Sequence, residues 1–364
     1  MSDTSWTSAG HPAPAGFDLD PQTEALAASI KLPAGFRSIA EDPEFGSDIF
    51  TGMAKVEKRL LDAVASSDPV IDRASKHLAE AGGKRVRPLL VLISAMLGEG
   101  INDNVLQAAT VVEMTHLATL YHDDVMDDAP LRRGTPTAQQ VWGNSVAILT
   151  GDLILARASV LGAQLGTHAV ALQAKTFERL CLGQLHEFVG PSEQDDPVAH
   201  YIDVMSDKTA SLIAAAGEFG TYYGHAAPET TEILADYGEK VGIAFQLADD
   251  VIDVTGGSKK AGKVTGTDLR EGVPTLPVLL LRQDAAAGDA EAQRVLSLVD
   301  ADLTSDEALA TAVDALAGNP ATQRAWDVAK DWSRQAIEAL APLQEGTVKE
   351  ALEAFADAVV TREG

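Results

Sequence analysis

The sequence predicts an all-α protein, and two observations support this prediction. Apolar residues recur at three- and four-residue steps through long segments, as they do on the buried face of a helix. Short runs that alternate apolar and polar residues between turns are nearly absent, and Ala and Leu dominate between the breaks. Because no linker-like change of composition follows residue 50, we expect one helical bundle over residues 46–364 rather than two domains.

The expected elements follow in order along the chain. Residues 1–45 are rich in Pro, Ala, Ser and Gly, which predicts a poorly ordered arm. From about Asp48 the pattern is helical, and Ile101–Asp128 and Thr230–Val254 are predicted to be long helices with one buried face. Clusters of Gly and Pro predict breaks at 81–84, 128–136, 189–197, 255–263 and 271–277.

Composition narrows the class of protein. The 364 residues suffice for a large core, and 46% hydrophobic with 23% charged residues is typical of a globular protein. Lys and Arg total 28 against 54 Asp and Glu, a net charge of −26, which argues against a nucleic-acid partner. Basic clusters in so acidic a chain are therefore informative.

Cysteine content and apolar runs bear on localisation. Cys181 is the single cysteine, so no intramolecular disulfide can form and a reducing compartment is expected. The first residues lack the basic and apolar parts of a secretion signal. We expect no transmembrane segment, since the apolar run from Val86 to Leu97 is too short to span a membrane. These features together predict a cytoplasmic protein.

An acidic motif occurs twice, near the end of each long predicted helix. LYHDDVMD at 120–127 and QLADDVID at 246–253 share the pattern Asp-Asp-x-x-Asp. On a helix the first and last aspartates of each motif share a face, with the middle one beside them. Crowded carboxylates destabilise a fold unless cations offset them. The six are Asp123, Asp124, Asp127, Asp249, Asp250 and Asp253.

Oxygen ligands of this kind suit Mg²⁺, which commonly bridges protein carboxylates to a substrate phosphate. No cluster of His and Cys with zinc-site spacing competes for the role. A single such motif in an acidic protein is equally well explained as a solvated helix face. Two copies at the ends of apolar helices favour a metal site.

Basic residues flank the acidic motifs. GGKRVRP at 82–88 supplies Lys84, Arg85 and Arg87, and LRRG at 131–134 supplies Arg132 and Arg133. Taken singly, each is an ordinary surface charge, as are Lys208 and Lys263 further along. Because Arg grips phosphate with two hydrogen bonds, the set together predicts a site for two polyanionic groups, one held by metal and one by side chains.

With these motifs assembled, the sequence resembles the trans-polyprenyl diphosphate synthases, which elongate isoprenoid chains head to tail. The resemblance runs from about Lys55 to the C-terminal region and rests on an ordered set of motifs: GGKRVRP, HDDVMD followed by RRG, GDLILA, SDKTAS, FQLADDVID and GTDLREGVPTLP. It implies an all-α isoprenoid-synthase bundle around a deep central cavity, usually a homodimer, with both acidic helices pointing into the cavity. It also allows a peripheral membrane contact for product release.

The resemblance further implies substrates, metal and roles. The substrates would be isopentenyl diphosphate and an allylic diphosphate. Two or three Mg²⁺ ions would be held by Asp123, Asp127 and Asp249, with Asp124, Asp250 and Asp253 as further ligands or water-bridged support. The allylic diphosphate would be contacted by Arg132 and Lys208, with Lys263 nearby. Isopentenyl diphosphate would be held by Lys84, Arg87, His116 and Arg133. The reacting centre would be lined by Thr209 and Gln246.

The chemistry expected of such a site follows from charge. Metal neutralises the departing diphosphate, so the allylic substrate can ionise, and the alkene of isopentenyl diphosphate attacks the cation. The released diphosphate takes the proton, which explains why no catalytic His or Glu base is evident. From spacing alone His116 is better explained as a core histidine; only the resemblance favours a substrate contact.

Product length is predicted from the residues deeper on the face of Asp123, which are Ala118, Thr119 and Thr115. In the family, bulky aromatics at the positions of Ala118 and Thr119 stop the growing chain early. Small residues here predict an all-trans product of about C30 to C50, since the space stays open. The alternatives are a shorter product, geranylgeranyl or farnesyl diphosphate, and the simple abundance of Ala in this chain.

One departure and two other functions complete the prediction. Val273 stands where the family usually has Lys, so Lys263 or Arg270 is expected to compensate. A class I terpene cyclase is disfavoured, because it needs no second-substrate motif such as GGKRVRP. A catalytic subunit that requires a partner subunit stays open.

Overall fold

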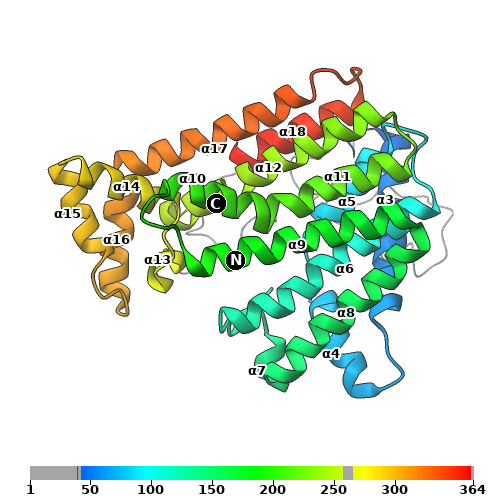
Figure 1. Ribbon diagram of the computed structural model, residues 1–364, viewed down its shortest axis with the longest axis horizontal. Coiled ribbons are helices and arrows are strands. Elements are labelled where there is room, and N and C mark those ends of the chain that lie inside the picture. Colours follow the sequence, from blue (N-terminus) through cyan, green and yellow to red (C-terminus); the bar gives the residue numbers. More distant parts are fainter. Residues whose placement is uncertain (1–38, 40–41, 257–264, 362–364) are drawn as a thin grey trace. The chain divides into compact units, whose positions relative to one another are not determined.

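The computed structural model describes residue 39, residues 42–256 and residues 265–361 (Figure 1). Helices dominate the described residues, which confirms the predicted all-α class. The exception is a short antiparallel hairpin, β1 (Leu131–Arg132) and β2 (Thr135–Pro136), at one of the predicted breaks. Most of the predicted arm, residues 1–45, lies outside the described residues, and the first long helix begins within its last positions, at Pro43.

The helices in chain order are α3 (Pro43–Val64), α4 (Pro69–Glu80), α5 (Val86–Ala95), α6 (Asp103–Met126), α7 (Ala138–Trp142), α8 (Asn144–Leu165), α9 (Thr167–Val189), α10 (Pro197–Met205), the π-helical turn η2 (Ser206–Ala210), α11 (Ser211–Tyr223), α12 (Pro228–Thr255), α13 (Thr267–Glu271), α14 (Leu276–Ala286), α15 (Ala290–Val299), α16 (Asp306–Ala317), α17 (Pro320–Ala339) and α18 (Thr347–Thr361). The two long helices predicted from periodicity are present as α6 and α12, but the single buried face predicted for the first is wrong: every residue from Thr110 to Thr115 is buried, so α6 is enclosed on all sides.

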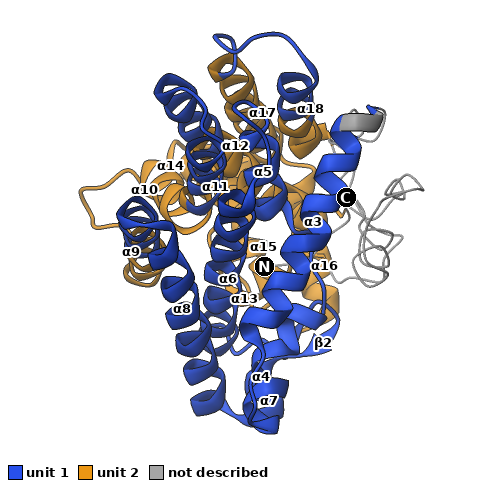
Figure 2. Ribbon diagram, turned by 90° about the vertical axis from the view of Figure 1, so that its right-hand side faces the viewer, with its two compact units in different colours: residues 1–178, 212–238, 340–354 blue, residues 179–211, 239–339, 355–364 orange. Residues whose placement is uncertain are grey.

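The contacts of the chain group into two compact units (Figure 2). Unit 1 consists of Met1–Glu178, Leu212–Gly238 and Leu340–Ala354, and unit 2 of Arg179–Ser211, Glu239–Ala339 and Phe355–Gly364. The first acidic motif belongs to unit 1 and the second to unit 2. A single domain over residues 46–364 and a cavity shared by both motifs therefore stay predictions.

In unit 1, α6 packs most extensively against α8. Tyr121, one of the largest fully buried side chains, donates its hydroxyl to the carbonyl of Ala74 on α4 at 2.5 Å. This bond anchors the end of α6 that carries the first acidic motif. The surrounding core consists of Leu60, Val64, Leu78, Ala79, Met114, Leu117, Ala118, Leu120, Tyr121, Ala138, Ala147, Ile154 and Ala158.

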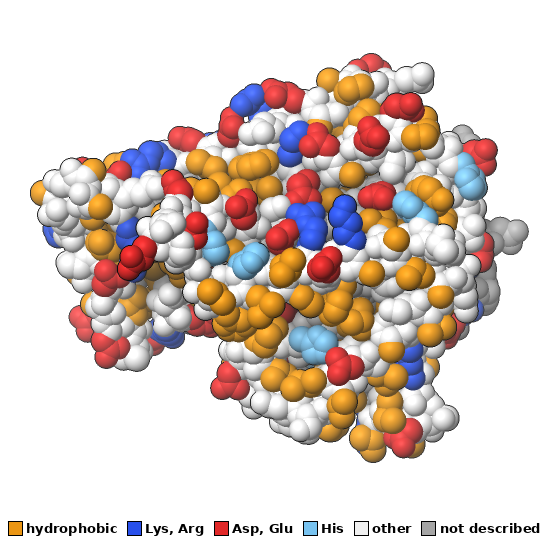
Figure 3. Space-filling view, in the orientation of Figure 1, with side chains coloured by type: hydrophobic (Ala, Val, Ile, Leu, Met, Phe, Trp, Pro, Cys, Tyr) orange, Lys and Arg blue, Asp and Glu red, His pale blue; other side chains and the backbone are white. Residues whose placement is uncertain are grey.

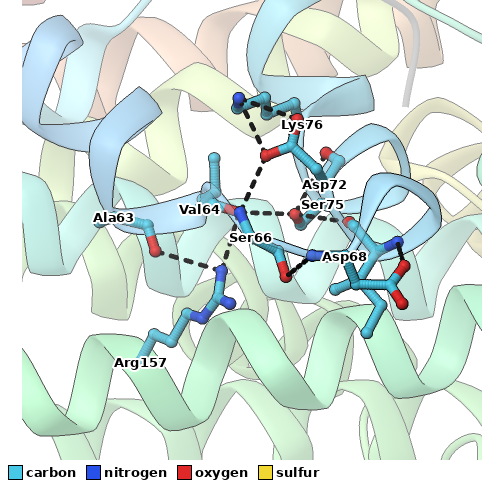
Figure 4. Close-up of polar contacts among 9 residues, drawn as sticks. Ala63, Val64, Ser66, Asp68, Asp72, Ser75, Lys76 and Arg157 are labelled. Atoms are coloured by element: carbon cyan, nitrogen blue, oxygen red, sulfur yellow. Dashed lines mark hydrogen bonds and ion pairs between the residues drawn. The ribbon is translucent and has the colours of Figure 1, made fainter.

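Polar contacts fix the connection from α3 to α4 (Figure 4). Arg157 of α8 donates to the carbonyl of Val64 at 2.8 Å, which satisfies a backbone group that the end of α3 leaves open. The Asp72 carboxylate accepts from the backbone N–H of Ser66 at 2.8 Å and from Lys76 at 2.9 Å, and both contacts lower the pKa of Asp72. The position of α4 is thereby set, and α4 leads directly into the GGKRVRP segment.

One helix of the described residues, α8, is long and apolar enough by length and composition to cross a membrane. No such segment was expected from the sequence, where the run from Val86 to Leu97 was judged too short and α8 was not considered. Only 33% of its most apolar window is buried, yet α8 gives Ala147, Ile154 and Ala158 to the core of unit 1. Core helices pass the same test, so composition alone is weak support for a membrane span.

Unit 2 has a core of its own. Helix α14 packs against α15 and α17, and α15 packs against α16. Apolar side chains such as Val278, Leu281, Val295, Leu309 and Val313 fill this core. The part of α12 that belongs to this unit carries the second acidic motif.

Candidate active site

The middle aspartate of the first motif is a buried partner of Arg132. The Asp124 side chain is 1% exposed and accepts from Arg132 Nε and Nη2, each at 2.6 Å. Burial raises the pKa of Asp124, and Arg132 opposes that shift. The second carboxylate oxygen, Oδ2, is buried without a hydrogen-bond partner. Asp124 therefore fixes the hairpin of Arg132 to the end of α6.

The outer aspartates of this motif are more accessible. Asp123 is half-buried, whereas Asp127 is exposed and follows the last residue of α6 in a helical conformation. The backbone N–H of Asp127 donates to the carbonyl of Asp123 at 2.8 Å, so the helical spacing of the two residues persists past the end of the helix. The motif thus combines one buried, structural carboxylate with two that are more exposed.

The structure brings the two basic segments together, as the sequence predicted. Arg133 donates to the carbonyls of Leu78, at 2.8 Å, and of Gly82, at the start of GGKRVRP. A Cβ on Gly83 would lie 2.8 Å from Arg133 Cζ, so a side chain at this position would displace the guanidinium. Arg85 and Arg133 both adopt positive φ, 47° and 54°, which is unfavourable for a side chain of this size.

Arg85 has a structural role that the sequence analysis did not assign. Its guanidinium bonds to Glu57 of α3 at 2.9 Å and to Glu113 of α6 at 2.7 Å. Burial alone would lower the pKa of Arg85, but Glu113 and Glu57 hold it above its usual value. No local signal marked either glutamate, because each lies 28 residues from its partner.

Arg87 and His116 belong to the same group of basic residues as Arg85 and Arg133, and burial lowers the pKa of both. Arg87 Nε is buried without a hydrogen-bond partner, and burial lowers the pKa of Arg87. Burial also lowers the pKa of His116 well below its usual range, with Arg87 and Arg133 adding to the effect. Lys84 is half-buried in the turn before α5. Guanidinium groups beside a neutral imidazole form an environment that favours an anion.

The middle aspartate of the second motif is also buried, but its partners are neutral. Asp250 is 2% exposed; Tyr201 donates its hydroxyl to Oδ2, and the Gln246 amide lies 3.5 Å from Oδ1. Burial raises the pKa of Asp250 well above its usual value. The Tyr201 bond opposes this shift, and the neighbouring carboxyls of Asp268 and Asp249 add to it. Asp249 itself is half-buried.

Asp268 adds a fourth carboxyl beside the three aspartates of the second motif. Asp253 is half-buried and accepts from the backbone N–H of Asp268 at 3.2 Å. Burial, followed by repulsion from Asp253, raises the pKa of Asp268 to about 7. GTDLREGVPTLP supported the family resemblance, but no role was predicted for this aspartate. Its position in the first turn of a short helix that follows a glycine was the available signal.

Lys208 and Thr209 lie on the π-helical turn η2. Lys208 donates to Glu187 of α9, and Thr209 Oγ1 lies 3.4 Å from Gln246 Oε1. Within unit 2, Thr209 thus lies beside Gln246, and Gln246 lies beside Asp250. Such π-helical turns are rare and frequently occur at functional sites.

The remaining predicted residues are placed as follows. Lys263 lies outside the described residues. Val273 lines a pocket of about 340 Å³ in unit 2 together with Arg270 and Arg282. Arg270 forms an ion pair with Asp306 of α16 at 2.6 Å, so its guanidinium is engaged at this pocket.

The three predicted length-determining residues follow one another down α6. Ala118 is fully buried in the core of unit 1. Thr119 is half-buried, and its hydroxyl donates to the carbonyl of His116 at 2.8 Å. Thr115 is buried and accepts from the Gln173 amide of α9 at 3.3 Å.

The described residues contain no group of three His, Cys, Asp or Glu side chains that could hold a metal by themselves. The donors of both motifs are carboxylate oxygens, and Asp124 Oδ2 is buried without a partner. This donor set fits Mg²⁺, which keeps water and phosphate oxygens among its ligands.

Comparison with known proteins agrees with the motifs. The family model described as polyprenyl synthetase matches residues 68–316. The chain belongs to the polyprenyl synthetase family. A member of this family is a prenyltransferase of isoprenoid synthesis, and its fold is the all-α isoprenoid-synthase fold.

Three relatives show how far the family likeness extends. Nonaprenyl diphosphate synthase of Mycobacterium tuberculosis is 42% identical over 89% of this chain and 96% of its own length. Heptaprenyl diphosphate synthase component 2 of Geobacillus stearothermophilus is 37% identical over 70% of this chain and 77% of its own. A crystal structure of geranylgeranyl pyrophosphate synthase from Corynebacterium glutamicum, complexed with calcium and isoprenyl diphosphate, has 41% identity and a TM-score of 0.79, with coverage of 89% and 98%.

Proposed function

We propose that this polyprenyl synthetase condenses isopentenyl diphosphate with an allylic diphosphate in a Mg²⁺-dependent head-to-tail reaction. The observation that carries the proposal is the buried Arg87 Nε, which has no partner and lies in a cluster with Arg133 and the neutral His116. Leaving a buried charged donor unsatisfied is costly, so a ligand with many acceptor oxygens is expected at this place. Isopentenyl diphosphate has such a group, and Lys84 would add a fourth cationic or polar contact.

The allylic diphosphate is assigned to the acidic motifs and to Lys208. Asp123, Asp127, Asp249 and Asp253 would hold Mg²⁺, while Asp124 and Asp250 support the motifs through Arg132 and Tyr201. Bound Mg²⁺ would neutralise the charge of the departing diphosphate. Lys208, which donates to Glu187 in the structure, would release Glu187 and contact that diphosphate. Thr209 and Gln246 would line the reacting centre.

For product length we propose a long chain of about C30 to C50, since Ala118 and Thr119 leave the space that bulky side chains would fill. The names of the relatives do not decide this point, because a nonaprenyl and a geranylgeranyl synthase are almost equally identical to the chain.

A shorter product, about C20, is the second candidate, and one observation favours it. The Thr115–Gln173 hydrogen bond, 3.3 Å long and buried, lies eight residues along α6 from Asp123, a distance of about 12 Å. An apolar tail that reached this pair would have to separate two hydrogen-bonded groups without replacing the bond, which is unfavourable.

The proposed assembly is a cytoplasmic homodimer. Helix α8 exposes Leu149 and Val160 by 65% and 61%, and α9 exposes Leu185 and Phe188 by 57% and 61%. Figure 3 shows groups of apolar side chains on the molecular surface. Exposed apolar patches mark interaction surfaces. Cys181, also on α9, is exposed.

The experiment that tests the function is product analysis of the purified chain with radiolabelled isopentenyl diphosphate, Mg²⁺ and a series of allylic primers. We expect prenyl diphosphates longer than the primer, and none when Mg²⁺ is chelated. A cyclic hydrocarbon from farnesyl diphosphate alone would identify a cyclase instead. Activity that appears only with a second protein would identify a two-component synthase, which the name component 2 indicates for the heptaprenyl relative.

Two variants decide the product length. Ala118→Phe is expected to shorten a long product to about C15 to C20, because the ring fills the space near Asp123. Gln173→Leu with Thr115→Val removes the polar pair and is expected to lengthen the product only if the pair limits the wild type. An unchanged distribution in Ala118→Phe would exclude this position as the limit.

A further inference from the structure

One face of α9 contacts the π-helical turn that carries Lys208. This face contains Arg179, Gly183 and Glu187, which follow one another at four-residue steps. Each of the three contacts η2 in a different way. The guanidinium of Arg179 bonds to it, the backbone at Gly183 approaches it closely, and the carboxylate of Glu187 accepts from the Lys208 side chain. All of these residues belong to unit 2.

Arg179 makes the most contacts of the three. Its Nε donates to Asp207 Oδ1 at 2.6 Å, and its Nη2 donates to Ser206 Oγ at 2.8 Å. The same guanidinium bonds both oxygens of Glu239 on α12, at 2.6 and 3.0 Å. The side chain is 29% exposed, so water screens these ion pairs only in part.

The backbone of α9 approaches the turn closely one helical turn further on. A Cβ added to Gly183 would lie 2.7 Å from the backbone nitrogen of Lys208 and 3.0 Å from Asp207 Cβ. A π-helical turn has a less favourable hydrogen-bond pattern than an α-helix and persists where its surroundings stabilise it. Arg179 supplies such a stabilising contact on the two residues immediately before Lys208.

We propose that Arg179 is a positioning residue, which holds η2 between α9 and α12 so that Lys208 and Thr209 are presented to the allylic diphosphate. This inference rests on the proposed function of Lys208. Arg179 itself is not assigned a contact with substrate, because its guanidinium is engaged by Asp207, Ser206 and Glu239. None of these four residues belongs to the roles assigned from sequence.

The test compares Arg179→Gln with Arg294→Gln, a matched control that removes a 57% exposed arginine of the same unit. We expect Arg179→Gln to raise the KM for the allylic diphosphate about tenfold and to leave the KM for isopentenyl diphosphate unchanged. Arg179→Lys keeps the charge but not the planar fork, so it should recover part of the loss. Thermal melting of each variant reports general destabilisation.

A second measurement does not depend on turnover. Calorimetric binding of farnesyl thiodiphosphate, a slowly ionising allylic analogue, should weaken about tenfold in Arg179→Gln and in Glu239→Gln, and the double variant should lose little more than either. Equal parameters for Arg179→Gln and Arg294→Gln would overturn the inference, as would equal losses for both substrates. If the wild type formed no product, the proposed function would fail by itself, and calorimetry would still decide the role of Arg179.

Discussion

The two acidic motifs have the same sequence pattern but opposite electrostatic surroundings. In the first, the buried Asp124 is bonded twice by the guanidinium of Arg132, at 2.6 Å. In the second, the buried Asp250 is bonded by the hydroxyl of Tyr201, and the carboxyls of Asp268 and Asp249 raise its pKa further. The first middle aspartate is paired with a fixed cation of the protein, whereas the second is bonded by neutral groups and lies beside carboxyls that raise its pKa.

This difference shows that one motif can be stabilised in two ways. The ion pair with Arg132 opposes the rise that burial causes in the pKa of Asp124, and it fixes the hairpin to α6. A group of carboxyls with raised pKa values is poised to lose protons when a divalent cation arrives. We therefore expect metal and pH to change the stability of the second motif more than that of the first. Loss of its arginine should change the stability of the first motif more than the matching loss changes the second.

The largest expected effect concerns catalysis and should be shared by both motifs. Asp123→Ala and Asp249→Ala each remove a half-buried carboxylate proposed to hold Mg²⁺. Each is expected to lower kcat at least about 1000-fold, equivalent to about 4 kcal/mol. Incorporation of radiolabelled isopentenyl diphosphate measures the loss, with the exposed Asp314→Ala of α16 as a matched control. Activity within tenfold of wild type in either variant would contradict the shared role.

The next effect should separate the motifs. Arg132→Gln leaves the Asp124 carboxylate buried without its cation, so we expect a loss of about 3 kcal/mol in the free energy of unfolding. Urea denaturation measures it. The double variant Asp124→Asn with Arg132→Gln should recover part of the loss, because no uncompensated charge remains. A stability equal to wild type in the single variant would argue against a fixed ion pair.

The matching change in the second motif should cost less. Tyr201→Phe removes one hydrogen bond to Asp250, a carboxyl whose raised pKa allows it to remain neutral. We expect a loss of about 1 kcal/mol in the free energy of unfolding, measured in the same denaturation assay. A loss as large as that of Arg132→Gln would abolish the distinction between the two motifs.

The smallest effect is a pH dependence confined to the second motif. The pKa of Asp268 is raised from 3.8 to about 7, so the folded state holds this proton more tightly than the unfolded state does. The contribution of Asp268 to stability therefore falls as pH rises from about 4 to 7. Asp268→Asn should stabilise the metal-free protein at pH 8 by on the order of 1 kcal/mol and leave it unchanged at pH 4.

Urea denaturation in the presence of a chelator measures this difference, and Asp314→Asn serves as the control. Added Mg²⁺ should raise the stability of the wild type at pH 8 more than that of Asp268→Asn. A variant less stable than wild type at pH 8 would show that the charged form of Asp268 is stabilising.

Much of the fold and part of the site could be predicted from sequence. Apolar residues at three- and four-residue steps predicted the existence of α6 and α12, although α6 is buried on all sides and not on one face. Helical spacing predicted which aspartates share a face. The bonds of Arg133 to Leu78 and Gly82 place RRG beside the start of GGKRVRP, while the anion site predicted from these segments stays a prediction.

The supporting residues could not be predicted, for a physical reason. Glu113, Tyr201 and Glu239 act on partners 28, 49 and 60 residues away, and a lone polar residue on a helix carries no signal of such a distant contact. The hairpin at 131–136 was missed because two-residue strands are too short for alternation to be visible.

The single thiol of the chain has a practical consequence. Cys181 is exposed on α9, two residues from Arg179 and two from Gly183, and burial raises its pKa. One fluorophore or spin label can therefore be attached at alkaline pH without adding or removing any residue. Its alkylation rate and spectrum would report in real time whether a second copy covers α9 and whether the neighbouring turn moves when diphosphate arrives.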